Sequence, residues 1–117
     1  MEYKFEVGEP ITEEAALAEA AALGLHAFAF DVVTEEDETL HWHEFDAVTW
    51  VISGTGALRD GEGSLIQVGP GCRAETPAGW LHQGLAGPPV RVVLGASMPY
   101  AEWTMPIDKD PALLTSR

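Results

Sequence analysis

The stretches that decide the fold are HWHEFDAVTWVISG, residues 41–54, and GCRAETPAGWLH, residues 71–82. The first begins with His41 and His43 on either side of a tryptophan and closes on a glycine. Residues two apart in an extended strand share a face, so both imidazoles are expected to point the same way. The second stretch ends in His82, the third of only four histidines in the chain. The geometry of the pair can hold one metal ion, a weak signal by itself that the setting of His82 strengthens.

Both stretches resemble the two sequence motifs of the cupins. The first motif is a His-x-His pair followed by a hairpin and a strand that closes on glycine, and residues 41–54 have this form. The second motif is matched in residue type and spacing by Gly71, Pro77, Gly79 and His82. The resemblance implies an all-β fold, a double-stranded β-helix or jelly-roll barrel whose mouth receives the three histidines. It also implies one divalent transition metal per barrel, which would be Fe, Ni, Zn, Cu or Mn.

Three positions depart from the cupin pattern. The glycine expected ahead of the histidine pair is Glu35, and the asparagine expected after the second-motif histidine is Ala86. The carboxylate ligand that the family usually supplies falls on Ala47, which cannot bind a metal. Three hypotheses follow. The site uses three histidines, as in the cupin thiol dioxygenases; or Asp46 or Glu44 serves as a displaced oxygen ligand; or the site has decayed and binds no metal.

The strand after the histidine pair also predicts a pocket. Thr49 and Val51 share the parity of Ala47, so these three side chains are expected to line the pocket, and Trp80 is expected either to roof its mouth or to seal the barrel end. Residues 48, 50 and 52 are apolar and face the other way, so the outer face needs a cover. A helix or a second subunit can provide that cover, and a homodimer is predicted.

The rest of the chain predicts one domain over residues 1–117. Thr12, the acidic pair that follows it and the alanine-rich run up to Gly24 predict a helix over about 12–24. Alternating apolar residues predict a barrel over about 27–96. Its strands are expected near 27–33, 38–43, 47–53, 55–60, 63–68, 72–76, 81–86 and 90–96. The tail, residues 97–117, is expected to fold back over the barrel. It holds Tyr100, Trp103 and Met105, and its aromatic residues are expected to pack there.

The composition of the chain argues against nucleic acid and membranes as binding partners. Nineteen acidic residues against six basic ones give a formal net charge of −13, and a field of that sign repels nucleic acid and anionic membranes. No apolar run approaches the roughly 20 residues of a membrane helix. The N-terminus has no signal-peptide pattern, so a cytoplasmic location is predicted. Cys72 is the only cysteine, which excludes an intrachain disulfide and is typical of a small buried apolar residue.

These observations predict a small metal-dependent cupin enzyme acting on a small organic molecule. The oxygenase, isomerase or lyase class is expected, with a dioxygenase-like reaction favoured. The alternative is a non-catalytic cupin that binds or senses a small ligand in the same pocket. No catalytic base can be named, because the pattern leaves open whether Arg73 or Glu75 faces inward.

Overall fold

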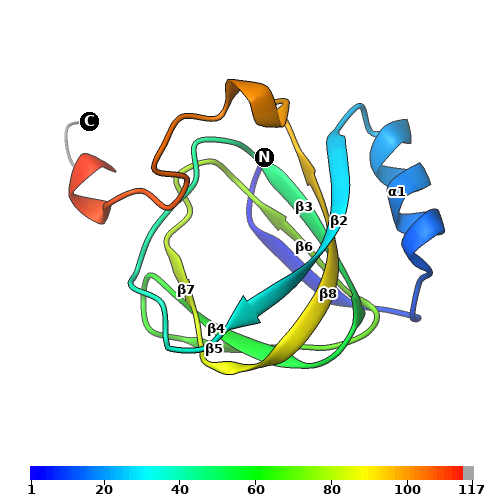
Figure 1. Cartoon of the computed structure of the whole chain (residues 1–117), viewed down its shortest axis with the longest axis horizontal. Helices are drawn as coiled ribbons and strands as arrows, with labels where there is room; N and C mark the ends of the chain where they lie inside the picture. The colour runs from blue at the N-terminus through cyan, green and yellow to red at the C-terminus, as the bar shows by residue number, and fades with distance from the viewer. Residues whose placement is uncertain (115–117) are drawn as a thin grey trace.

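The computed structural model describes residues 1–114, which form two antiparallel β-sheets that close into a barrel (Figure 1). The larger sheet has the strand order β1-β6-β3-β8-β2, and the smaller has the order β5-β4-β7. The strands are β1 (Lys4–Val7), β2 (His26–Thr34), β3 (Ala47–Ser53), β4 (Gly56–Asp60), β5 (Leu65–Val68), β6 (Cys72–Thr76), β7 (His82–Gly84) and β8 (Gly87–Ala96). The predicted all-β barrel with one N-terminal helix is therefore confirmed.

The strand predictions fail at two places. The strand predicted over 38–43 is wrong, because this segment forms only isolated bridges, from His41 to His82 and from Trp42 to Lys109. The adjacent residues His41 and Trp42 pair with two different parts of the chain, so no continuous ladder develops. Strand β1 was not predicted, and it pairs with β6 at the edge of the larger sheet.

The N-terminal helix covers the outer face of the larger sheet. It is α1 (Glu13–Ala22), and Thr12 caps it by accepting a hydrogen bond from the Ala15 amide at 3.1 Å. Figure 1 shows the helix against one side of the barrel. Ala16 and Ala20 are completely buried there and pack with Val48, Trp50 and Val93. The sequence allowed either a helix or a second subunit to cover this face, and in the structure α1 covers it.

The described part of the tail, residues 97–114, folds back onto the barrel, and residues 115–117 lie outside the described residues. It contains two short 3₁₀ helices, η1 (Tyr100–Glu102) and η2 (Pro111–Leu114), and its backbone meets the segment ahead of β3 at the bridge between residues 42 and 109. Trp103 packs as predicted, stacked on Phe45 with 4.2 Å between ring centroids. The Tyr100 ring contacts the rings of Phe28 and Trp103, although much of its side chain is exposed. No helix within residues 1–114 is long and apolar enough to cross a membrane.

A glycine on β8 tests the contact between helix and sheet. A Cβ added to Gly95 would lie 3.1 Å from the Leu25 Cβ and 3.3 Å from the Ala20 Cβ. The Gly95→Val variant should therefore lose about 1–3 kcal/mol of unfolding free energy, the usual cost of overpacking a core. Chemical denaturation followed by circular dichroism measures this loss.

The matched control is Gly87→Val on the same strand, where an added Cβ comes no closer than 4.0 Å to another atom. This variant should stay within about 0.5 kcal/mol of the wild type, as surface substitutions usually do. Equal losses in the two variants would show that α1 does not press on β8 as described.

Candidate metal centre

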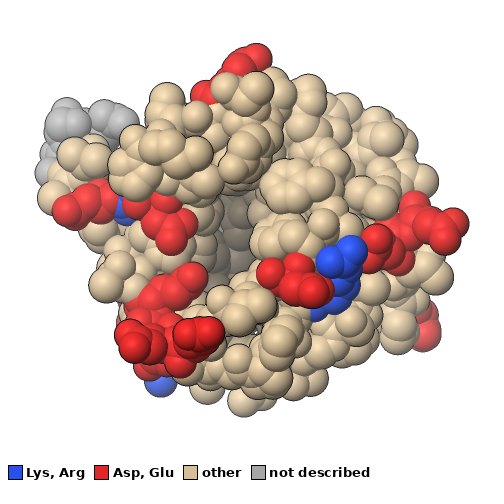
Figure 2. Space-filling view, viewed as in Figure 1, with Lys and Arg blue, Asp and Glu red and all other residues tan. Residues whose placement is uncertain are grey.

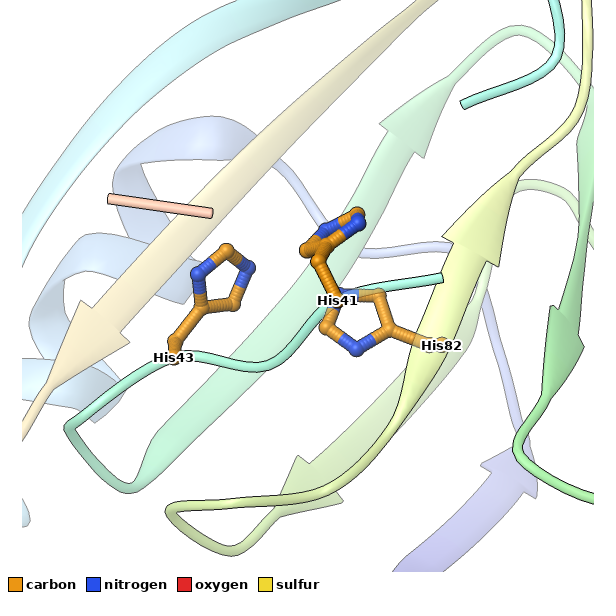
Figure 3. A group of neighbouring side chains, drawn as sticks. All are labelled: His41, His43 and His82. Atoms are coloured by element: carbon orange, nitrogen blue, oxygen red, sulfur yellow. The ribbon is translucent and has the colours of Figure 1, made fainter. Parts of the chain in front are cut away.

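The three predicted histidines come together at one end of the barrel. His41 and His43 lie in the segment ahead of β3, and His82 is the first residue of β7. The backbones of His41 and His82 exchange two hydrogen bonds of 2.9 Å each. Directly opposed residues of an antiparallel pair place their side chains on the same face. Each histidine offers one ring nitrogen to a group whose members all lie within 4.8 Å of one another (Figure 3).

Each histidine is oriented by a hydrogen bond from its Nδ1 to a backbone carbonyl. The bonds run from His41 to Thr39 (2.7 Å), from His43 to Ile107 (3.0 Å) and from His82 to Trp80 (3.0 Å). A carbonyl oxygen only accepts, so the proton of each neutral ring resides on Nδ1 and the Nε2 lone pair is free. This arrangement, in which a backbone group fixes the tautomer of a ligating imidazole, is usual around protein-bound metals.

Aromatic stacks hold two of the three rings in place. In one stack Trp80 lies between Tyr3 and His82, and in the other Phe45 lies between His43 and Trp103. The rings of Tyr3 and Trp80 are 4.5 Å apart at their centroids and nearly parallel. Because packed aromatic neighbours restrict ring rotation, the histidines are preorganised before any ligand arrives.

Burial also sets the charge of the site. His41 is 4% exposed. Desolvation lowers the pKa of His82 to about 4, against a smaller opposing effect of the hydrogen bond to Trp80. Desolvation likewise lowers the pKa of His43. His43 and His82 are therefore neutral at pH 7, which is the state that a metal ion requires.

The two displaced acids proposed from the sequence lie elsewhere, so that hypothesis is wrong. Glu44 accepts hydrogen bonds from the backbone and hydroxyl of Thr104, and Asp46 accepts one of 2.8 Å from the Ala78 amide. Neither residue lines the central cavity. Ala47 does line it, with its methyl group packed beside Phe45.

A carboxylate that the sequence analysis missed lies beside the histidines. The Oδ1 atom of Asp108 is 3.7 Å from His41 Nε2 and 3.8 Å from His43 Nδ1. No motif surrounds Asp108, and it lies 65 positions after His43 along the chain. The bridge between Trp42 and Lys109 brings it here, and pairing of that kind has no local sequence signal.

A cavity of about 510 Å³ opens from the histidines into the barrel. In Figure 2 a hollow lies near the centre of the face that Figure 1 views. All the residues predicted for the pocket line the cavity, namely Ala47, Thr49, Val51 and Trp80. Most of the wall is apolar and aromatic, including Phe28 and Phe30. Arg73 and Glu75 do not line it but pair with each other at 2.6 Å, so they supply no group to the cavity.

No family model matches the sequence, and no curated protein matches it. Among solved structures, a DUF861 family protein from Thermotoga maritima is similar with a TM-score of 0.55 and 14% identity, over 81% of this chain and 99% of that one. The DMSP lyase DddQ from Ruegeria pomeroyi is similar with a TM-score of 0.53 and 15% identity, over 72% of this chain and 44% of that one. The 3,4-ketoisomerase QdtA from Thermoanaerobacterium thermosaccharolyticum is similar with a TM-score of 0.51 and 13% identity, over 64% of this chain and 59% of that one.

Identities this low establish the architecture alone. They agree with the two-sheet barrel described above. The chain therefore has the cupin fold.

Proposed function

We propose that this protein is a metal-dependent enzyme of the oxygenase, isomerase or lyase class that acts on a small, mainly apolar organic molecule. One observation carries the proposal. The Nε2 atoms of three preorganised histidines face one another at the end of an apolar cavity of about 510 Å³. Convergent metal ligands beside a concave pocket of this size are typical of small-molecule enzymes.

The donor set fits a single divalent transition metal. His41, His43 and His82 would hold the ion through Nε2, since each Nδ1 is engaged with a carbonyl. Imidazole ligands suit Fe, Ni, Cu and Zn, and a site with a nearby carboxylate also suits Mn. A bound ion would supply Lewis acidity or redox chemistry at the inner end of the cavity. The chain itself would orient the ligands and exclude bulk water from the apolar wall.

The cavity wall favours a substrate with an apolar body. The net charge of −13 favours neither nucleic acid nor an anionic membrane as a partner. The solved structures of similar fold include a DMSP lyase and a sugar 3,4-ketoisomerase, and both classes are compatible with the proposal. This chain covers less than half of the lyase, so the substrate is inferred from the cavity rather than from that protein.

The homodimer remains part of the proposal, as does a cytoplasmic location. Strands β1 and β2 are the edges of the larger sheet, and Val7 and Val33 on them are exposed. Exposed apolar edge strands favour pairing with a second copy. Sedimentation equilibrium at micromolar concentration should give twice the chain mass, and a strict monomer would contradict the dimer.

The metal site is tested by replacing one ligand. Wild-type protein purified after growth in metal-supplemented medium should carry about one divalent ion per chain, because three imidazoles form one site. His82→Ala should retain less than about a tenth of that metal, since two ligands hold an ion poorly. Elemental mass spectrometry measures both. His26→Ala is the control, as His26 is exposed at the start of β2 and lies outside the cavity. Full occupancy in the His82 variant would refute the assignment.

The low pKa of His82 predicts a pH-dependent stability of the metal-free protein. The pKa falls from 6.5 in the unfolded chain to about 4 in the fold. Between these values the unfolded state binds more protons, so the unfolding free energy decreases as pH falls. In buffer that contains a metal chelator, the unfolding free energy of the wild type should fall between pH 7 and pH 5 by up to about 2 kcal/mol more than that of His82→Gln. Parallel losses in the two proteins would show that His82 is not held neutral.

A further inference from the structure

We propose that Asp108 is the carboxylate ligand of the metal centre, delivered by the C-terminal segment in place of the acid that is absent at Ala47. The C-terminal segment is defined here as residues 104–110. The inference rests on the proposed metal-dependent function and extends it with a ligand that lies outside both sequence motifs. Four features of the described residues support it: pairing register, distance, anchoring, and the engagement of the other nearby acids.

The pairing register places Asp108 on the histidine face. Trp42 and Lys109 exchange two backbone hydrogen bonds, of 2.9 and 3.2 Å, as an antiparallel bridge. The next position along the bridge sets His43 opposite Asp108. Side chains alternate between the two faces of an extended pair, so Asp108 shares the face of His41 and His43, and Trp42 points away. The hydrogen bond from His43 Nδ1 to the Ile107 carbonyl fixes the same register.

The distance from Asp108 to His41 is close to that between two ligand atoms of one ion. Asp108 Oδ1 lies 3.7 Å from His41 Nε2, the ring nitrogen whose lone pair is free. Ligand atoms on a tetrahedral ion with bonds near 2.0–2.1 Å are separated by about 3.4 Å. The second contact, of 3.8 Å, is to His43 Nδ1, which is engaged with the Ile107 carbonyl. The aspartate side chain, which is more than half exposed, would therefore turn toward the Nε2 atoms to join the three histidines on one ion.

The C-terminal segment is anchored strongly enough to hold a ligand. Lys109 is only 9% exposed, and its ammonium donates to the Thr104 carbonyl, the Thr104 hydroxyl and the Pro106 carbonyl at 2.8–3.0 Å. Glu44 lies 3.7 Å from the same ammonium. The Trp42 indole donates to the Asp110 carbonyl at 2.9 Å. A buried, fully bonded lysine one position from Asp108 fixes the backbone from which the carboxylate projects.

Asp108 is also the acid near the histidines that has no other structural task. Within residues 1–114 its carboxylate accepts no hydrogen bond, and it lies within 4 Å of the imidazoles of His41 and His43. Glu38 lines the same cavity, but its Oε1 accepts the Gly84 amide at 2.8 Å. The Asp108 carboxylate is engaged with no other protein group and is more than half exposed, so it is free to turn toward an ion held by the imidazoles beside it.

Titration of metal-stripped protein with Co(II) tests the proposal. Asp108→Asn should weaken Co(II) binding by more than about 100-fold, beyond the roughly 10–100-fold that loss of an outer hydrogen-bonding partner costs. Its visible absorption should also change in intensity and position, because the band depends on coordination number and donor type. Asp108→Glu should keep affinity within about tenfold, since it preserves the donor. Competition with a chelator gives the affinities.

The control is Asp110→Asn, which makes the same charge change two positions away in the same segment. An asparagine can still accept the hydrogen bond that Asp110 Oδ1 takes from the Ala112 amide, so this variant should match wild type. Wild-type affinity and an unchanged spectrum in Asp108→Asn would overturn the inference. So would a loss below about 100-fold with the wild-type spectrum, which would make Asp108 a positioning residue. A wild type that takes up no Co(II) would instead refute the proposed function.

Discussion

Two reciprocal hydrogen bonds between the backbones of His41 and His82 are the constraint on which this site depends. They join segments 41 residues apart and align the two sequence motifs as directly opposed residues. The Gly79 amide strengthens the junction by donating to the His43 carbonyl at 2.9 Å. Gly79 has φ of 86°, a backbone conformation that L side chains rarely adopt, which explains a glycine at this turn. Once the register is set, neither imidazole can leave the other without breaking the barrel end.

Much of the fold and the core of the site could be predicted from sequence because their signals are local. A two-residue histidine spacing fixes a shared face, and the same alternation separates Thr49 and Val51 from Trp50 on β3. The helix was predictable because Thr12 and the acidic pair mark its start. The glycine and proline of the second motif mark the turn ahead of His82. Each of these predictions needed only residues that are neighbours in the chain.

The rest depends on contacts between distant segments, which a local pattern does not encode. Asp108 reaches the histidines through the bridge to Trp42 and the anchoring of Lys109, and neither is visible in the tail sequence. Glu44 and Asp46 were plausible ligands because they follow His43 closely. They instead hold the tail at Thr104 and the turn at Ala78. The choice between helix and partner subunit over Trp50 likewise required the packing of α1 to be seen.

Apolar side chains pack around Ala47, the position where the cupin pattern would place an acid. The small side chain lies in a cluster with Phe45 and Ala96, and Trp103 of the tail packs against it. The stack that Trp103 makes on Phe45 continues to His43, so the tail supports a ligand from the side where a glutamate would otherwise project. The tail thus contributes both to the packing and to the charge of the centre. X-ray absorption at the cobalt edge of the Co(II)-loaded protein tests this account most directly. It predicts three imidazole nitrogens and one carboxylate oxygen at about 2.0–2.2 Å, and a shell of water oxygens without imidazole scattering would contradict it.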